Sequence, residues 1–134
     1  MHRIAGWLGL ALAAAFLVAG ARRLVTYEVA DRSMAPTLQP GDWALGWRGS
    51  RARPGDVVVL EHPGRAGFDL VKRVAAGPGE PVGGMPLGPG EIWVLGDNPG
   101  AGSVDSRALG PIPADRVRAR LFLRYHPGPL ASIR

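Results

Sequence analysis

Three of the Pro-Gly pairs are followed by an acidic residue and then by a short apolar run. They stand at residues 40–42, 54–56 and 89–91, and the runs that follow them read WALGW, VVVLE and IWVLG. Pro-Gly suits the two central positions of a type II turn, because proline presets the first backbone angle and glycine accepts the positive φ of the second. The β-branched and aromatic residues that follow are strand formers. This pattern predicts tight turns between short strands.

Three further segments complete the prediction of a mostly β fold. They read LVTYEV (24–29), FDLVKRVAA (68–76) and VRARLFLRY (117–125). The last alternates apolar residues with arginines, as a strand with one buried face does. No amphipathic helix longer than a turn or two is evident after residue 23. We therefore expect a compact, mostly antiparallel β domain over residues 24–134, with a flexible loop over residues 78–90.

Residues 4–21 form an uncharged segment with arginines on both sides. Eighteen such residues are just long enough to cross a bilayer, although alanine and glycine make the segment only moderately hydrophobic. A cleaved signal peptide is the alternative, because Ala19-Gly20-Ala21 fits a small-x-small cleavage site. The arginine pair at 22–23 disfavours cleavage there, so we expect residues 1–23 to form a retained transmembrane helix. The charges on its two sides leave its orientation open.

The composition excludes several classes of function. Cysteine is absent, so the chain has no disulfide, no thiolate metal site and no cysteine nucleophile. The three histidines are far apart and lack the spacing of metal ligands, so we expect no metal and no cofactor. The net charge of +5 would suit an anionic partner. However, the basic residues are scattered, without the aromatic interleaving of a nucleic-acid groove, so we expect no nucleic acid among the partners.

Lys72 is the only lysine among sixteen basic residues, and it stands in an apolar run. Arginine stays protonated at physiological pH, whereas a desolvated lysine amine can lose its proton and act as a base. Ser33 is the hydroxyl that such a base could activate, since no histidine stands in a suitable context. The pKa of Lys72 would have to fall from about 10.4 to about 8, which costs roughly 3 kcal/mol. The alternatives are a lysine left by chance and a serine that caps a turn.

The order of the motifs resembles the type I signal peptidase family of membrane-bound serine-lysine peptidases. SMAPTL comes first, then the lysine and arginine of FDLVKRVAA, then GDN and SVDSR. The resemblance covers the chain from the uncharged N-terminal segment to RLFLRY. It implies the compact antiparallel β core of that family. Because only residues 73–95 separate Lys72 from the GDN motif, it implies a short form without a large accessory β domain.

The resemblance also implies roles for the matching residues. Ser33 corresponds to the acyl-forming nucleophile and Lys72 to its general base. Ser103 corresponds to the serine whose hydroxyl orients the lysine amine. A hydroxyl can do this without raising the pKa of the amine, as a carboxylate would. The supporting residues that it implies are two ion pairs, Asp105 with Arg107 and Asp97 with Arg73.

The substrate implied by the resemblance is an extended peptide, cleaved after a small-x-small sequence. It would add as a strand along residues 29–31 and 69–71. Asp31 is a departure from the family, which usually carries glycine or serine there. An ionised carboxylate near an oxyanion would oppose its charge, so either this side chain turns away or the activity is altered. The residues implied to bind the substrate are Val29, Asp31, Met34, Leu38, Leu70 and Val71.

We therefore expect a membrane-bound serine endopeptidase that cleaves N-terminal signal or leader peptides from precursor proteins. The expected location is a cytoplasmic (inner) membrane, with the catalytic domain extracytoplasmic and the lipid bilayer as a second partner. LVKRVAAGPGE, WVLGDNPGAG and RLFLRYHP also resemble peptidases that remove the N-terminal extension of nickel superoxide dismutase precursors.

Two other classes remain as alternatives. A self-cleaving serine-lysine repressor would carry a DNA-binding helical module in place of the uncharged N-terminal segment. A non-catalytic membrane adaptor on the same fold would be indicated by the loss of Ser33 or Lys72, and both residues are present.

Overall fold

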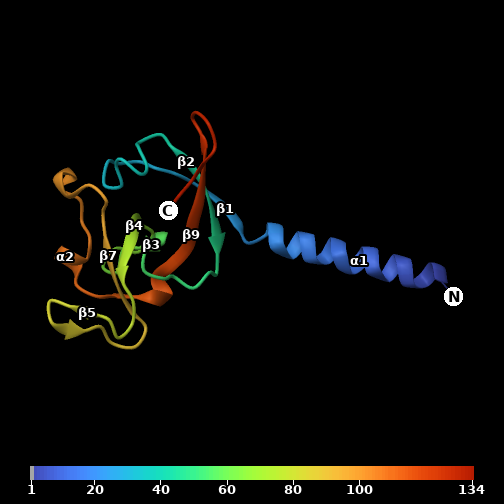
Figure 1. Ribbon diagram of the computed structural model, residues 1–134, viewed down its shortest axis with the longest axis horizontal. Helices are drawn as coiled ribbons and strands as arrows, with labels where there is room; N and C mark the ends of the chain where they lie inside the picture. Colours follow the sequence, from blue (N-terminus) through green and yellow to red (C-terminus); the bar gives the residue numbers. More distant parts are fainter. Residues whose placement is uncertain (1) are drawn as a thin grey trace.

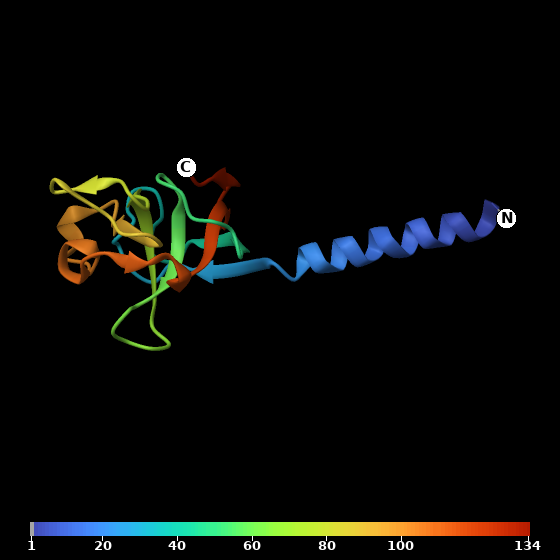
Figure 2. The same cartoon turned by 90° about the horizontal axis from the view of Figure 1, so that it is seen from below.

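The computed structural model describes the backbone of residues 2–134 and the side chains from Leu10 onward. One long helix, α1 (His2–Ala21), projects from a β domain that contains the rest of the chain (Figure 1). A view from below shows the same separation: the helix extends away from β1, and the other strands lie together at the far side of the domain from the N-terminus (Figure 2). The chain therefore divides near residue 22 into a helix and a β domain.

One antiparallel sheet forms most of the domain. The order of its strands is β1-β2-β9-β3-β4-β7-β8, and β10 pairs with β9. The mostly antiparallel β fold expected from the sequence is confirmed, and the six segments predicted as strands all form strands. The long strands are β1 (Leu24–Glu28), β2 (Trp43–Arg48), β3 (Val57–Glu61), β4 (Asp69–Ala76), β7 (Glu91–Leu95) and β9 (Val117–His126), and the short ones are β8 (Ile112–Pro113) and β10 (Ala131–Ser132).

The Pro-Gly turns have the backbone geometry that the sequence predicts. Gly41, Gly55 and Gly90 have φ angles of +89°, +95° and +70°. This is the left-handed region that the second central position of a type II turn requires. The strands β2, β3 and β7 begin one or two residues after these glycines. Local turn chemistry therefore sets where three of the strands start.

The segment over residues 78–90 differs from the flexible loop that we expected. It contains a small hairpin in which β5 (Pro81–Val82) pairs with β6 (Met85–Pro86). The two residues between them, Gly83 and Gly84, both have positive φ angles, as the tightest β-hairpin turns require. At the base of the hairpin, the backbone N–H of Leu87 donates to the carbonyl of Glu80, and the N–H of Gly79 donates to the carbonyl of Leu87. A glycine pair thus orders a segment whose composition alone suggested flexibility.

Strand β3 supplies both halves of the hydrophobic core. Val57 and Val59 point to one face of the sheet, whereas Val58 and Leu60 point to the other, because successive side chains of a strand alternate. This explains why VVVL is apolar at every position. One cluster contains Val29, Met34, Leu38, Ala44, Val57, Val59 and Leu121, and the other contains Val58, Leu60, Leu70, Val74, Ile92, Val94 and Ile112.

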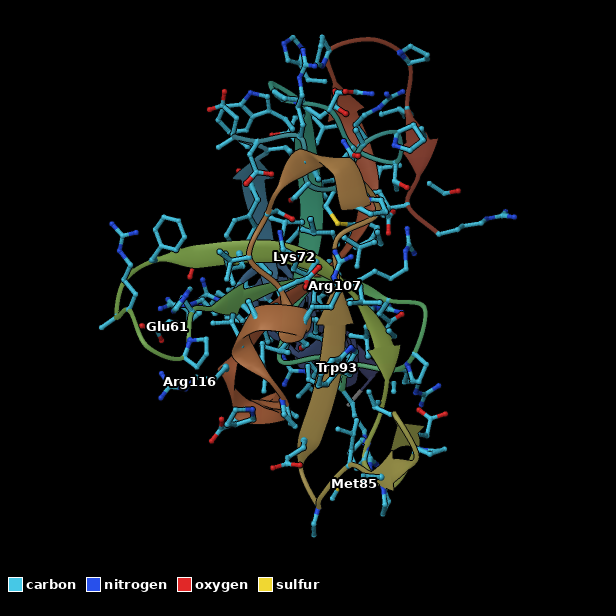
Figure 3. The ribbon with its side chains drawn as sticks, turned by 90° about the vertical axis from the view of Figure 1, so that its left-hand side faces the viewer. Glu61, Lys72, Met85, Trp93, Arg107 and Arg116 are labelled. Atoms are coloured by element: carbon cyan, nitrogen blue, oxygen red, sulfur yellow. The ribbon has the colours of Figure 1, made fainter. Side chains whose placement is uncertain are left out.

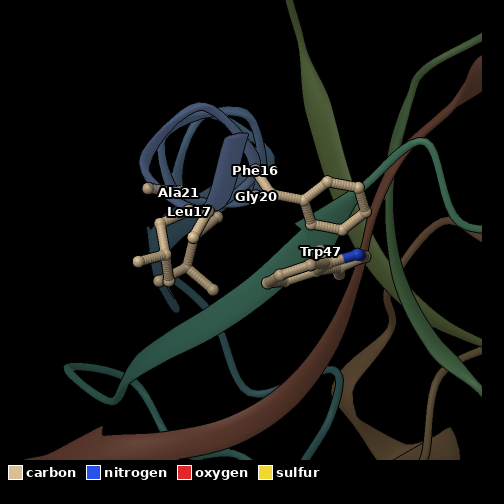
Figure 4. A pocket seen from close by; sticks show the side chains of 7 residues that line it. Phe16, Leu17, Gly20, Ala21 and Trp47 are labelled. Carbon is tan, nitrogen blue, oxygen red and sulfur yellow. The ribbon is translucent and has the colours of Figure 1, made fainter. Parts of the chain in front are cut away.

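The last turns of α1 meet the sheet beside β2. Phe16 and Trp47 face one another there and line an apolar pocket (Figure 4). In the described part of the chain, no helix is both long enough and apolar enough to cross a membrane. The membrane span expected over residues 4–21 is therefore not supported. The other residues that line the pocket are Ala13, Leu17, Gly20, Ala21 and Leu24.

Replacing Leu60 with alanine tests the role of β3 in the core. Leu60 is fully buried, so Leu60→Ala removes packed methyl groups and leaves a cavity. We expect the free energy of unfolding to fall by about 2–5 kcal/mol, as measured by urea denaturation. Leu130→Ala is the matched control, because Leu130 is 71% exposed. Equal losses in the two variants would contradict the assignment of β3 to the centre of the core.

Candidate active site

Ser33 lies in the loop between β1 and β2, and its side chain is buried. Its neighbour Met34 and the nearby Leu38 are held in the hydrophobic core, at 1% and 0% exposure. The backbone N–H of Leu38 also donates to the carbonyl of Met34, at 3.0 Å, so this segment forms a tight turn. The two apolar side chains thus anchor the loop and fix the position of the serine.

Lys72 lies in the middle of β4, and its side chain extends towards Ser33. Its neighbours on the same face of the strand, Leu70 and Val74, pack into the core, and Lys72 itself is only 1% exposed. The Nζ atom of Lys72 lies 2.8 Å from the Oγ atom of Ser33. Lys72 lies at the centre of the domain, whereas Glu61, Met85 and Arg116 lie at its edge (Figure 3). The two residues predicted to react together are therefore in direct contact.

The surroundings of Lys72 favour its neutral form. Burial lowers the pKa of the Lys72 ammonium, because the charged form loses its hydration. The negative charges of Asp31 and Asp105 act in the opposite direction and raise this pKa, but burial has the larger effect. The sequence predicted this direction from the apolar neighbours of the lysine.

Two depressions flank Ser33, and Asp31 lines both. One is a groove with an apolar wall of Val29, Met34, Val59 and Val71. The other is more polar and lies over the loop that follows β7. Its further lining residues are Arg32, Asn98, Gly100, Ala101 and Ser103.

Two of the residues predicted to line substrate pockets lie elsewhere. Leu70 points into the core, because it alternates along β4 with Val71, which lines the groove. Leu38 is fully buried in the other core cluster and does not reach the groove. The remaining predicted residues, Val29, Asp31, Met34 and Val71, do line the groove.

The predicted pair of Arg73 and Asp97 is present and joins three segments. The Nε and Nη2 atoms of Arg73 donate to the two carboxylate oxygens of Asp97, at 2.8 and 2.7 Å. Thr37, in the loop of Ser33, donates its hydroxyl to the same carboxylate. Arg73 also donates to the carbonyl of Gly55 at 2.8 Å. This network ties β4 and the end of β7 to the loop of Ser33.

The predicted pair of Asp105 and Arg107 is also present, with Nη2 and Oδ2 2.7 Å apart. Asp105 is buried, begins the short helix α2 (Ser106–Leu109) and accepts a hydrogen bond from the backbone N–H of Gly96. Hydrogen bonds from the Arg107 side chain, and from the backbone N–H groups of Gly96 and Arg107, lower the pKa of the Asp105 carboxyl to about 2. The carboxylate is therefore ionised throughout the neutral range.

Ser103 lies beside Ser33 but makes no hydrogen bond with Lys72. Its Oγ atom is buried and has no hydrogen-bond partner among the residues that the structure describes. The predicted contact that would orient the lysine amine is thus not formed, although the hydroxyl lines the polar depression next to Ser33.

Three residues that the sequence analysis did not single out hold the site together. Thr37 completes the network of Asp97, and Asn98 donates its backbone N–H to the carbonyl of Ser33 at 2.9 Å. A side chain at Gly96 would place Cβ 2.8 Å from that same carbonyl oxygen, so only glycine fits. The signal in the sequence was the GDN motif directly after an apolar strand.

Asp31 does not turn away from Ser33. Its Oδ1 atom accepts a hydrogen bond from the backbone N–H of Ser33, at 2.8 Å. Burial alone would raise the pKa of Asp31, but the hydrogen bonds from Ser33 and the charge of Lys72 outweigh it and lower this pKa. Asp31 is therefore a charged neighbour of the serine, and of the two outcomes expected from the sequence, the side chain turning away is not the one observed. In the described residues, no group of three or more His, Asp or Glu gathers as a metal site would need.

Titration of the folded protein in acid tests the buried Asp105. The pKa of Asp105 is lowered from 3.8 to about 2 in the folded state. The stability that its carboxylate contributes is therefore present above pH 3.8 and is lost as the pH falls through about 2. We expect the gap between the free energies of unfolding of wild type and Asp105→Asn, measured in urea at each pH, to narrow over this window.

Asp115→Asn, at an exposed carboxylate of the 3-10 helix η2 (Ala114–Arg116), is the matched control. A gap between wild type and Asp105→Asn that stays constant from pH 5 to pH 2 would show that the Asp105 carboxylate does not stabilise the fold.

Comparison with known proteins gives one family and a consistent set of relatives. The family model described as "Signal peptidase, peptidase S26" matches residues 2–84, which include Ser33 and Lys72. The chain is similar to the protein named mitochondrial inner membrane protease subunit 1 in several species. The Schizosaccharomyces pombe protein is 32% identical, over 72% of this chain and 70% of the relative. The human protein is 31% identical over 71% and 65%, and that of Xenopus tropicalis 33% over 73% and 69%. The chain thus spans about two thirds of the length of these relatives.

Proposed function

Because the chain belongs to the signal peptidase family, peptidase S26, we propose that it is a serine endopeptidase that removes N-terminal signal or leader peptides from precursor proteins. The observation that carries this proposal is the 2.8 Å contact between the Oγ of Ser33 and the Nζ of a fully buried Lys72. A lysine that is buried in an apolar strand and has a lowered pKa is suited to accept a proton.

Catalysis would proceed through an acyl-enzyme. The neutral Lys72 amine takes the proton of Ser33 while Oγ attacks the scissile carbonyl carbon, and the resulting ammonium then protonates the departing amine. A water molecule, deprotonated by the same lysine, adds to the acyl carbon and releases the product acid and the free serine. The backbone N–H of Ser33 is the proposed donor to the oxyanion, a type of contact that contributes about 3–4 kcal/mol in other acyl-transfer enzymes.

The supporting roles follow from the contacts of the loop after β7. We assign the two ion pairs, Arg73 with Asp97 and Asp105 with Arg107, to holding this loop against the backbone of Ser33. Ser103 is our proposed partner for the Lys72 ammonium that forms during the reaction. Its buried Oγ has no partner among the described residues.

The groove beside Ser33 supports an extended peptide as substrate. Residues 69–71 pair with β3 on one side, while β7 pairs with β4 only from Arg73 onward. The other edge of residues 69–71 therefore has no strand partner within the described residues, and a substrate strand could add there. The apolar wall of Val29, Met34 and Val71 favours small apolar side chains next to the cleaved bond.

Membrane association is part of the proposal. The relatives are named as inner membrane proteases, and α1 exposes large apolar side chains to its surroundings. We propose that residues 1–23 attach the protein to a bilayer and that residues 24–134 form the catalytic domain. The exposed side chains of α1 are Leu10, Leu12, Phe16, Leu17 and Val18.

A dedicated precursor is the second candidate substrate. The sequence resemblance to peptidases that mature nickel superoxide dismutase precursors supports one specific precursor as the alternative to a broad set. Cleavage of either substrate would use Ser33 and Lys72, so the same variants should abolish both activities. Only the choice of precursor in the assay separates the two candidates.

Replacing Lys72 tests the proposed base. Lys72→Arg keeps the positive charge but cannot deprotonate, and Lys72→Met keeps the approximate shape without an amine. We expect each to lower kcat/KM by at least about a thousandfold, as expected when a general base or nucleophile is removed. Cleavage is measured in detergent on a precursor with an Ala-x-Ala site and on a nickel superoxide dismutase precursor.

The controls separate chemistry from folding. Ser33→Ala should be as inactive as the lysine variants, whereas Arg120→Lys, an exchange at a surface ion pair of β9, should cleave at the wild-type rate. Thermal unfolding of each variant checks that it is folded. Cleavage by Lys72→Met at the wild-type rate would place the base elsewhere, and failure of wild type on both precursors would favour the non-catalytic adaptor.

A further inference from the structure

The backbone N–H of Ser33 is already engaged in the resting site. It donates to the Oδ1 of Asp31 at 2.8 Å. In acyl-transfer enzymes, the N–H of the nucleophile points to where the oxyanion of the tetrahedral intermediate develops. In this chain a carboxylate oxygen, which resembles an oxyanion in charge and in hydrogen bonding, occupies that donor before any substrate arrives.

We propose that Asp31 caps the nucleophile: its carboxylate holds the Ser33 N–H in the resting enzyme and must be displaced before the acyl-transfer step. Asp31 is thus a positioning residue that sets the rate and the pH range of the reaction. This inference rests on the proposed peptidase function, because it concerns the same serine and the same lysine.

The charge of Asp31 acts on the base as well as on the donor. Two carboxylates, Asp31 and Asp105, raise the pKa of Lys72 against the effect of burial. The charge of Asp105 is compensated by Arg107 at 2.7 Å, whereas Asp31 forms no salt bridge among the described residues. Asp31 therefore favours the protonated lysine, which cannot accept a proton from Ser33. Both effects of this carboxylate oppose the first step of catalysis.

The position of Asp31 makes displacement by a substrate feasible. The residue is exposed, and it lines the depressions on both sides of Ser33. A peptide that lies across the serine therefore contacts Asp31 and brings its own carbonyl oxygen towards the same N–H. The contact also has the form of an Asx turn, which could serve only to shape the loop. Faster acylation of Ser33 after removal of the carboxylate distinguishes a cap from a simple turn, because a turn that only shapes the loop does not slow the reaction.

The lone lysine allows a direct measurement of this effect. Lysine labelled with ¹³C at Cε gives a single NMR signal from the full chain in detergent, because Lys72 is the only lysine. We expect the midpoint of its titration to fall by about one pH unit in Asp31→Asn, since an adjacent negative charge is removed. Asp115→Asn is the control, because Asp115 is not among the charges that act on Lys72. An unmoved midpoint in Asp31→Asn overturns the proposal.

A second measurement tests the capped N–H itself. Ser33 is acylated with a p-nitrophenyl ester, and the adduct is followed by mass spectrometry over a range of pH in wild type, Asp31→Asn and Asp31→Ser. We expect Asp31→Ser to react about tenfold faster or more on its alkaline plateau, because a hydroxyl holds the Ser33 N–H more weakly than a carboxylate does and carries no charge that opposes the oxyanion. The acylation rate of Asp31→Ser should also begin to rise at a lower pH than that of wild type. Ser33→Ala in the same background gives the background labelling.

The outcomes separate this inference from the proposed function. Equal plateau rates in wild type and Asp31→Ser overturn the cap and leave the peptidase proposal intact. The absence of Ser33 acylation in every variant, including Asp31→Ser, overturns both. A faster plateau together with a lowered Lys72 midpoint supports the cap.

Discussion

A lysine amine inside a protein core is unfavourable as a cation, and the site is arranged around that constraint. Lys72 lies on the face of β4 that also carries the core residues Leu70 and Val74, and the one hydrogen-bond partner of its amine among the described residues is the hydroxyl of Ser33. Desolvation alone would favour the neutral amine. The nearby carboxylates of Asp31 and Asp105 instead favour the charged ammonium, although the charge of Asp105 is compensated by Arg107. The balance between burial and the charge of Asp31 therefore decides how readily the Lys72 amine gives up its proton.

Strand β4 serves the site with both of its faces. Lys72 points inward to Ser33, whereas the next residue, Arg73, points to the opposite face and binds Asp97. The hydroxyl of Thr37 donates to the same carboxylate, so the proposed base and the arginine that holds the loop of Ser33 are adjacent in sequence. A strand can do this because successive side chains alternate by one residue. A slip of one residue in its pairing would exchange the two roles.

The sequence predicted what local chemistry controls. The Pro-Gly turns and the strands after them depend on φ preferences and side-chain alternation, and both are read from neighbouring residues. The contact of Ser33 with Lys72 was expected from the lone lysine and from the family resemblance. The position of Leu70, the missing contact of Ser103 and the hydrogen bond from Ser33 to Asp31 depend on how distant segments pack. The pairing of β4 with β7 even contains a register shift between Val74 and Ala76, which no local pattern reveals.

The short connection between α1 and β1 has a consequence for which bond the proposed peptidase would cut. The backbone N–H of Arg23 bonds to Gly20, its carbonyl accepts from Arg48, and β1 pairs with β2 along its whole length. The serine therefore stands at a set distance from the end of the helix, with the five residues of β1 spanning about 17 Å of it. A rigid spacer of this kind works as a ruler. If α1 rests on a surface that also holds the substrate of the proposed peptidase, the distance of a bond from that surface, together with its side chains, determines whether the bond is cut.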